Sequence, residues 1–254
     1  MSGGRRVNMI PMAGAGQRFR DAGYTLPKPL IPVGGVPMVV RAAAALPPAD
    51  HWIFLCRAEH VRDAGLDAEL ARRFAPATIL TVDALTEGQA ATCLLAAPAL
   101  RPDDCLTIGA CDNAMTYRAG ALQEAWREGA DAVIWTFRGH RAVLANPGMW
   151  GWVKVDAAGR VQGVSCKTPV SDRPLQDHAV IGAFSFRRAS DFLREAERTI
   201  ALNRRVNGEF YLDVVLDQAA VDGLDVRVLE VDRYIGWGTP NDLQAFEAGR
   251  DALP

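Results

Sequence analysis

Several residues with phosphate-binding chemistry lie close together near the N-terminus of the chain. Gly14, Ala15 and Gly16 follow a short apolar run, and their small side chains leave backbone N–H groups open to an anion. Arg18 comes two residues after this stretch, and Lys28 follows ten residues later. A backbone cradle with two cations beside it predicts a site for the phosphates of a nucleotide.

Two other phosphate-binding motifs begin in a similar way. The G-x-G-x-x-G fingerprint of dinucleotide-binding folds needs a third glycine, but Phe19 stands in its place. Instead of the short helix that should follow, we expect a segment interrupted by Pro27 and Pro29. A P-loop is excluded because no Gly-Lys-Ser/Thr is present. A Gly-rich turn with solvated cations is the remaining alternative, and the combination of Arg18 with Pro-Lys28-Pro argues against it.

A candidate metal ligand follows another strand-like run. Cys105–Gly109 is apolar, and Asp112 comes shortly after it, where open α/β sheets bind their ligands. Mg²⁺ binds to one or two carboxylates together with phosphate oxygens. We therefore predict that Asp112 holds Mg²⁺; the alternative is an Asp that caps a helix or forms a turn.

Strand-like and helical patterns alternate through residues 1–145. Strands are expected at Val7–Met12, Trp52–Cys56, Ala77–Val82, Cys105–Gly109 and Ala132–Phe137, and helices at Met38–Leu46, Ala90–Ala96 and Gly120–Glu128. This alternation predicts a parallel sheet covered by helices.

The pattern changes after about residue 145. A hairpin is expected where Trp152–Asp156 and Val161–Cys166 flank a turn-like Ala-Ala-Gly-Arg, and then a strand at Val180–Phe186 and helices at Ser190–Asn203 and Glu209–Asp222. The last helix is expected to begin with Thr239 as N-cap, Pro240 at the first position and Asp242 in the first turn.

These patterns predict one α/β domain over residues 1–254, with a mixed, mostly parallel sheet flanked by helices. Residues 1–145 are expected to form the nucleotide-binding half, and residues 146–254 a small β/α extension that binds the acceptor.

Composition limits the kinds of partner. The chain has 254 residues and a net charge of −2, without the basic excess that nucleic-acid binding requires. Its longest largely apolar stretch, Ala90–Leu100, is too short to span a bilayer. The five cysteines contain no C-x-x-C pair, which favours reduced thiols over disulfides or a zinc site. We expect a soluble, cytoplasmic protein that binds neither nucleic acid nor membrane, and a homo-oligomer is left open.

The Gly-x-Gly-x-Arg and Pro-Lys-Pro-Leu segments resemble the signature of the sugar-phosphate nucleotidylyltransferases. Further segments resemble the family's motifs in the same order: a base-recognition loop at Glu87-Gly-Gln-Ala, a metal-binding strand end at Cys111-Asp-Asn, an acceptor contact at Lys167-Thr-Pro, a helix start at Gly208-Glu-Phe-Tyr-Leu-Asp and a closing Gly238-Thr-Pro. The order of six motifs is far more specific than any single one.

The resemblance implies a Rossmann-like nucleotidyltransferase fold and an Mg²⁺-dependent enzyme that joins a nucleoside triphosphate to a phosphorylated acceptor and releases pyrophosphate. It implies catalytic roles for Arg18 and Lys28, and metal binding by Asp112. The nucleotide-binding residues that it implies are Ala13, Gly14, Ala15, Gly16 and Gln89, and the acceptor-binding residues are Lys167, Glu209 and Asp213. On the expected helix Glu209 and Asp213 are spaced i, i+4 and share one face, so a solvated face is the alternative for this pair.

One position departs from the family pattern. Many members carry a second metal-binding Asp two residues before the glycine of the Gly-Thr motif, where this chain has Gly236. A sugar 1-phosphate is the first expectation for the acceptor, and a cytidylyltransferase for a non-sugar phosphate or phosphonate is the alternative. Two other classes are a glycosyltransferase, whose D-x-D motif Asp112-Asn-Ala does not supply, and a non-catalytic nucleotide-binding protein.

Overall fold

The structure is a computed structural model that describes residues 4–249. Its strands are β1 (Arg6–Met12), β2 (Pro32–Val33), β3 (Val36–Pro37), β4 (His51–Arg57), β5 (Ala77–Val82), β6 (Cys105–Ile108), β7 (Asn113–Thr116), β8 (Ala132–Phe137), β9 (Gly151–Val155), β10 (Val161–Cys166), β11 (His178–Phe186), β12 (Val226–Glu230) and β13 (Arg233–Gly236).

The α-helices are α1 (Gln17–Asp21), α2 (Met38–Ala44), α3 (Ala58–Ala64), α4 (Leu66–Arg73), α5 (Gln89–Leu94), α6 (Ala121–Arg127), α7 (Ala142–Ala145), α8 (Ala189–Ala201), α9 (Leu212–Val221) and α10 (Pro240–Glu247). Short 3₁₀ helices are η1 (Lys28–Leu30), η2 (Ala97–Ala99) and η3 (Pro147–Met149). Within the described part of the chain, none of these helices has the length and apolar character needed to cross a bilayer.

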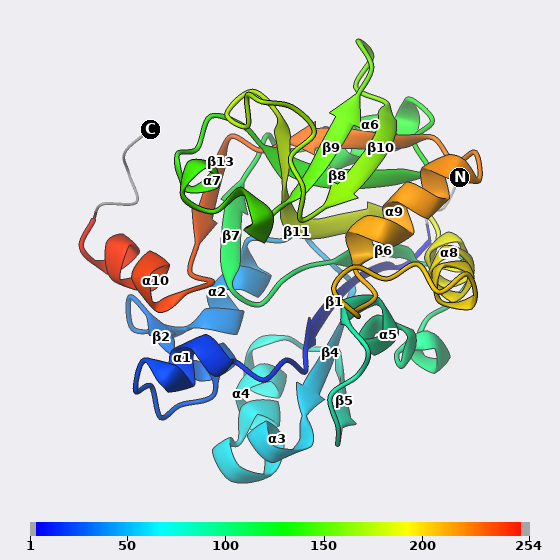
Figure 1. Cartoon of the computed structure of the whole chain (residues 1–254). Coiled ribbons are helices and arrows are strands. Elements are labelled where there is room, and N and C mark those ends of the chain that lie inside the picture. Colours follow the sequence, from blue (N-terminus) through cyan, green and yellow to red (C-terminus); the bar gives the residue numbers. More distant parts are fainter. Residues whose placement is uncertain (1–3, 250–254) are drawn as a thin grey trace.

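Nine strands of the described chain form one mixed sheet in the order β10-β9-β11-β6-β1-β4-β5, with β8 beside β11 and β12 beside β8 (Figure 1). Strands β6, β1, β4 and β5 run parallel to one another. Strand β11 is antiparallel to β6, β8 and β9. Parallel central strands with flanking helices confirm the predicted α/β fold class.

Strand β1 is buried on both faces of this sheet. Because side chains of a strand alternate between faces, Val7 and Met9 enter one apolar core, whereas Ile10 and Met12 enter another. Helices α5, α8 and α9 contribute to the first core, and α2 and α4 contribute to the second. The carboxyl end of β1 is therefore held rigidly from both sides, directly before the glycine-rich loop.

The segment after the glycines differs from the expectation. We expected no helix there, but α1 follows Gly16 at once, so this prediction is wrong. Gly16 adopts a left-handed φ of 64°, which turns the chain into the helix, and Phe19 anchors that helix with an exposed fraction of only 1%. Pro27 and Pro29 do not prevent the helix because they lie beyond its end.

The start of α9 is the second difference. The helix begins at Leu212, so Glu209 precedes it, and the prediction that Glu209 and Asp213 share a helix face is wrong. The residues before the helix are extended because their backbone pairs with another segment. The Phe210 carbonyl accepts a hydrogen bond of 2.9 Å from the Ala90 N–H group.

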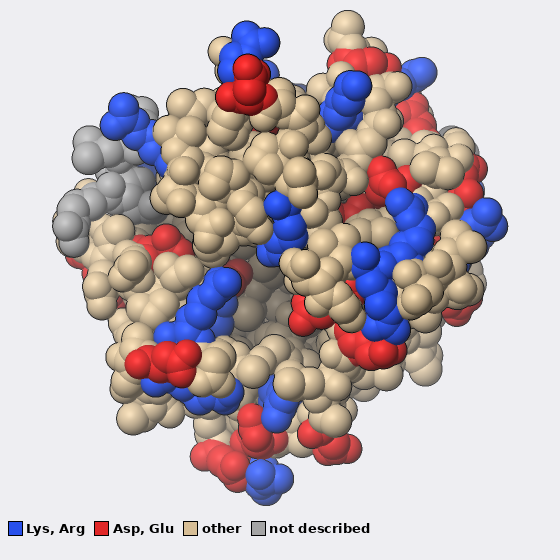
Figure 2. All heavy atoms as spheres, viewed as in Figure 1, with Lys and Arg blue, Asp and Glu red and all other residues tan. Residues whose placement is uncertain are grey.

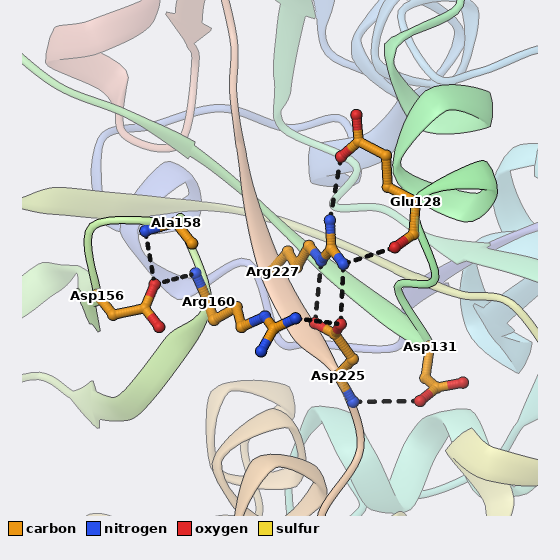
Figure 3. Close-up of polar contacts among 7 residues, drawn as sticks. All are labelled: Glu128, Asp131, Asp156, Ala158, Arg160, Asp225 and Arg227. Carbon is orange, nitrogen blue, oxygen red and sulfur yellow. Dashed lines mark hydrogen bonds and ion pairs between the residues drawn. The ribbon is translucent and has the colours of Figure 1, made fainter.

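The predicted hairpin is confirmed as the antiparallel pair β9–β10, and a charged network lies at its turn (Figure 3). Asp156 accepts a hydrogen bond from the backbone N–H of Arg160, which closes the turn. Arg227 on β12 forms ion pairs with Asp225 and with Glu128, and Arg160 lies within 3.8 Å of the Asp225 carboxylate. These contacts join the hairpin to β12 and to the end of α6.

A small sheet, β7 with β13, was not expected from the sequence. The two strands are antiparallel, and Gly236 pairs with Asn113. Helix α10 follows, and its predicted start is confirmed: the Thr239 hydroxyl accepts a hydrogen bond from the Asp242 N–H, and the Asp242 carboxylate accepts one from the Thr239 N–H. This arrangement brings the C-terminal segment next to Asn113 and thus close to the residue before it, Asp112.

Candidate active site

A cavity of about 830 Å³ is lined by residues from both halves of the chain. Arg18, Lys28 and Asp112 line it from segments that follow β1 and β6. Lys167 and Asp213 line it from the end of β10 and from α9. Figure 2 shows this face hollowed near its centre, with Lys and Arg side chains on two sides of the hollow. The structure thus brings five of the predicted site residues together.

The local sequence fixes the position of Lys28. It begins the 3₁₀ helix η1 between Pro27 and Pro29, whose rings restrict the backbone on both sides. A side chain at Gly16 would come within 3.3 Å of Lys28 Cβ, so the glycine loop lies directly against the lysine stem. The Lys28 Nζ lies 5.6 Å from the centre of the Phe19 ring. These contacts hold the ammonium group beside the glycine loop.

The ammonium group of Lys28 forms an ion pair with Asp112. Nζ lies 2.5 Å from Asp112 Oδ2 and also donates a hydrogen bond of 3.3 Å to the Gly238 carbonyl. Burial alone would lower the pKa of Lys28, but the Asp112 carboxylate offsets this, and the net pKa lies above the ordinary value. Lys28 is therefore charged in the cavity at neutral pH.

The surroundings of Asp112 leave room for a ligand. A side chain at Gly238 would lie 3.4 Å from Asp112 Oδ2, so the glycine keeps this side of the carboxylate open. The Asp112 backbone carbonyl accepts a hydrogen bond of 2.8 Å from the Trp237 N–H, which fixes the turn. The neighbouring Cys111 is not a competing ligand, because burial raises the pKa of its thiol to about 12.

Residues 4–249 hold no group of three or more His, Cys, Asp or Glu side chains that could bind a metal by themselves. A single accessible carboxylate suits Mg²⁺, which keeps most of its ligands as water and substrate phosphate. The Asp112 carboxylate therefore fits the part of an Mg²⁺ ligand that acts together with a nucleotide.

Lys167 is held in an unusual conformation at the opposite wall. Its φ of 68° is left-handed, which is strained for a residue with a side chain. The strain is compensated by a hydrogen bond from its N–H to the Trp150 carbonyl and by another from Nζ to the Met149 carbonyl. Nζ also lies 5.3 Å from the centre of the Tyr211 ring. These contacts hold the ammonium group in the wall of the cavity.

Asp213 is a buried carboxylate in the same wall, with an exposed fraction of 8%. Its Oδ1 has no hydrogen-bond partner among the described residues. A side chain at Gly151 would clash with Oδ1, so the carboxylate packs against a glycine backbone. Burial raises the pKa of Asp213 to about 6.

The sequence profile of the MobA-like NTP transferase domain matches residues 9–199, which span the glycine loop, the Asp112 turn and Lys167. The chain belongs to the MobA-like NTP transferase domain family. It is therefore a nucleotidyltransferase. A search of curated protein sequences finds no significant match.

Solved structures with the same fold support this assignment at the level of architecture. The nucleoside-diphosphate-sugar pyrophosphorylase from Vibrio cholerae RC9 has a TM-score of 0.76 and 21% identity, and the match covers 94% of this chain and 98% of that one. The inositol-1-phosphate CTP transferase from T. maritima has a TM-score of 0.74 and 16% identity, and the match covers 99% of this chain and 97% of that one. The UDP-glucose pyrophosphorylase from Acinetobacter baumannii has a TM-score of 0.69 and 17% identity, and the match covers 94% of this chain and 91% of that one.

The predicted phosphate-loop residues of this MobA-like transferase are not among the residues that line the cavity. Ala13, Gly14, Ala15 and Gly16 form the loop between β1 and α1, behind Lys28. Their role in phosphate binding stays a prediction.

The predicted base-recognition loop meets Glu209 outside this wall. Gln89 is the first residue of α5, after Gly88, whose φ of 121° only a glycine adopts readily. A side chain at Gly88 would come within 3.1 Å of Glu209 Cβ and closer still to the Phe210 backbone. Glu209 therefore lies beside the expected base loop of the transferase.

Some residues of the cavity wall were missed by sequence reasoning. Trp150 lines the cavity, whereas Trp152 is fully buried in the core. Tyr211 and Tyr234 also line the cavity. Tyr211 lies inside the Gly208-Glu-Phe-Tyr-Leu-Asp segment and Tyr234 lies four residues before Gly238, and that proximity was the available signal for these two residues. Arg141, also in the wall, follows no motif, and no signal in the sequence indicated it.

Proposed function

We propose that this transferase moves a nucleoside monophosphate group from a nucleoside triphosphate to a phosphorylated small-molecule acceptor, with release of pyrophosphate. The observation that carries the proposal is the shared cavity. Arg18 and Lys28 line it from the nucleotide-binding half, and Lys167 lines it from the acceptor-binding half. Cations on both sides of one cavity suit a reaction between two phosphorylated substrates.

In the proposed reaction an oxygen of the acceptor's phosphate attacks the α-phosphorus in line, and pyrophosphate leaves. No protein nucleophile is needed, so the protein acts by positioning the groups and neutralising their charge. Lys28 faces the α-phosphate, where charge develops, and Arg18 binds the β- and γ-phosphates. The glycine loop from Ala13 to Gly16 supports these phosphates with backbone N–H groups.

Asp112 is the residue that would hold Mg²⁺, because its carboxylate faces the cavity beside Gly238. The bound ion would supply positive charge to the phosphate oxygens of the nucleotide. Lys28 would bind phosphate oxygen of the nucleotide itself.

The acceptor binds at the wall formed by Lys167 and Asp213. Lys167 Nζ is positioned to hold an anionic group, and the ionised Asp213 can accept hydrogen bonds from hydroxyl groups. This pair suits a phosphate that carries several hydroxyls, for which a sugar 1-phosphate is the first choice. A non-sugar acceptor is the second, since Gly236 departs from the sugar-phosphate pattern and one similar solved structure is named as an inositol-1-phosphate CTP transferase.

The base is read by the loop that ends at Gln89. A side-chain amide offers both a donor and an acceptor to a base edge. Glu209 lies next to this loop at Gly88, and its side chain interacts with Tyr211 of the cavity wall, so it stands between the base loop and the acceptor side of the cavity.

A matrix of the four nucleoside triphosphates against sugar 1-phosphates, polyol phosphates and phosphonates, read by pyrophosphate release, tests the proposal. Arg18→Ala and Arg20→Ala form a matched pair on α1: Arg18 lines the cavity, whereas Arg20 is exposed and donates a hydrogen bond to Gln17. We expect release that depends on one acceptor class and is lost only with Arg18→Ala.

Three results would contradict the proposal. Activity that appears only with a nucleotide sugar as donor would indicate a glycosyltransferase. Tight nucleotide binding without release for any acceptor would indicate a non-catalytic nucleotide-binding protein. Equal losses in Arg18→Ala and Arg20→Ala would exclude the cavity as the site of transfer.

A further inference from the structure

The space that a side chain at residue 236 would fill is occupied by Tyr234. A Cβ atom at Gly236 would lie 2.9 Å from both Cε1 and Cζ of the Tyr234 ring and closer still to its hydroxyl. The two residues are two positions apart on β13, so their side-chain directions lie on the same face of the strand. The missing side chain at Gly236 is therefore what allows the tyrosine to lie along the strand.

Aromatic neighbours hold the Tyr234 ring in this position. The ring is stacked on Phe137 with centroids 4.6 Å apart and an interplanar angle of 14°. Trp150 and His140 contact it edge-on, with centroids 5.4 and 5.8 Å away. Such offset and edge-on contacts restrict a ring from several sides. The hydroxyl is consequently presented at a defined place.

That place belongs to the cavity that also contains the Asp112 carboxylate. Tyr234, Gly236 and Gly238 all line the cavity that contains Asp112. Gly236 pairs across the small sheet with Asn113, the residue after Asp112. A Cβ atom at Gly238 would lie 3.4 Å from Asp112 Oδ2, so the absence of a side chain there leaves open space next to the carboxylate. Two glycines thus open the C-terminal wall, one for a tyrosine hydroxyl and the other for a carboxylate.

We propose that Tyr234 is a substrate-contacting residue whose hydroxyl, lying over Gly236, donates a hydrogen bond to the acceptor's phosphate. The inference rests on the proposed function, because it requires that a phosphorylated acceptor enters this cavity. A neutral donor stabilises a phosphate oxygen without adding charge to a wall that already contains Lys28. It also explains how the site functions without a carboxylate at residue 236: the polar group there serves the acceptor rather than a metal.

The first test separates the hydroxyl from the ring. Tyr234→Phe keeps the stacked ring and removes only the donor. We expect kcat/KM for the acceptor to fall about 10- to 100-fold, as for the loss of a hydrogen bond to a charged group, while KM for the triphosphate is little changed. Tyr117→Phe is the control, since Tyr117 packs against Trp135 and is not among the residues that line the cavity.

The second test checks the placement without relying on activity. Gly236→Ala should lower Tm in the wild-type background, because the added methyl group displaces the Tyr234 ring. In a Tyr234→Ala background the space is empty, and the same substitution should cost little. Gly236 has an ordinary backbone conformation, so the alanine by itself introduces no strain in φ.

The outcomes distinguish the two proposals. An active wild-type enzyme with an unaffected Tyr234→Phe variant would overturn the contact and leave the proposed function standing. An equal Tm loss from Gly236→Ala in both backgrounds would show that the ring does not lie over residue 236, and would also overturn the inference. Absence of pyrophosphate release by the wild-type enzyme with every acceptor would overturn the proposed function and the contact together.

Discussion

Lys28 Nζ lies 2.5 Å from Asp112 Oδ2, although the two residues are 84 positions apart in the chain. The proposed catalytic cation and the proposed metal ligand therefore neutralise each other in this structure. In the proposed function Lys28 would bind phosphate oxygens of the triphosphate, and Asp112 would hold Mg²⁺, so each would have a partner other than the other. The pair explains how a half-buried lysine stays charged, because the carboxylate offsets the burial that would lower its pKa.

The role of Lys28 can be tested by its removal. Lys28→Ala should lower kcat on the order of 10²-fold or more and change KM for the triphosphate much less, because the charge matters most where negative charge develops in the transition state. Steady-state pyrophosphate release measures both constants. Lys154→Ala on β9 is the matched control, since Lys154 is exposed and not among the residues that line the cavity. Near wild-type turnover of Lys28→Ala would remove Lys28 from the mechanism.

The metal site can be tested by titration. Asp112→Asn keeps the shape but removes the charge, so we expect a steeply higher Mg²⁺ requirement and lower turnover. Without nucleotide, Mn²⁺ should bind wild-type protein weakly, because Lys28 already occupies the Asp112 carboxylate. Calorimetric titration with Mn²⁺, with and without nucleotide, measures the metal affinity independently of activity.

Two other carboxylates serve as comparisons for Asp112. Asp213 lines the cavity, whereas Asp232 is exposed and is not among its lining residues. Asp213→Asn and Asp232→Asn should leave the metal dependence near that of the wild type. An unchanged dependence in Asp112→Asn would refute the assignment, and a large shift in either of the others would identify the ligand instead.

Base reading by Gln89 gives a different kind of outcome. Gln89→Ala should change the preference among the four triphosphates more than it changes KM for the acceptor, because only the base edge loses a contact. Gln123→Ala on α6 is the control at an exposed helical position. A small effect that is equal for all four bases would mean that Gln89 is only a helix-surface residue.

Local pattern predicted the elements of the fold well. The expected strands Ala77–Val82 and Ala132–Phe137 agree with β5 and β8 at both ends. The reason is that both are short apolar runs with clear breaks on either side. The start of α10 was also predicted, because Thr239 and Asp242 satisfy the first turn through contacts three residues apart.

Contacts between distant segments were not available from such patterns. The ion pair of Lys28 with Asp112 depends on β1 and β6 being neighbours in the sheet, and strand order is a property of the whole fold. The place of the Tyr234 ring depends on its stacking against Phe137, which β8 contributes. Glu209 was misplaced for the same reason: its neighbour Phe210 pairs with a distant segment, and this pairing delays the start of the helix.

The pH dependence of stability follows from Asp213. Burial raises its pKa from 3.8 to about 6, so the folded protein holds this proton more tightly than the unfolded chain does. The contribution of this group to the free energy of unfolding is therefore highest below pH 3.8 and falls as the pH rises toward 6. Above that range the buried, ionised Asp213 lowers the free energy of unfolding by about 3 kcal/mol. Asp213→Asn removes this titrating group. The Tm of the variant minus the Tm of the wild type should therefore increase from pH 4 to pH 7.

A second carboxylate in α9 provides the control for that measurement. Asp217 forms an ion pair of 2.6 Å with Arg204, so Asp217→Asn should lower Tm at pH 7 instead of raising it. If the acceptor binds as proposed, it offers hydrogen-bond donors to the ionised Asp213 and should therefore raise the wild-type Tm more at pH 7 than at pH 5. This difference should disappear in Asp213→Asn. Parallel Tm profiles of wild type and Asp213→Asn between pH 4 and pH 7 would show that Asp213 does not titrate in this range, and would remove it as the group that senses the acceptor.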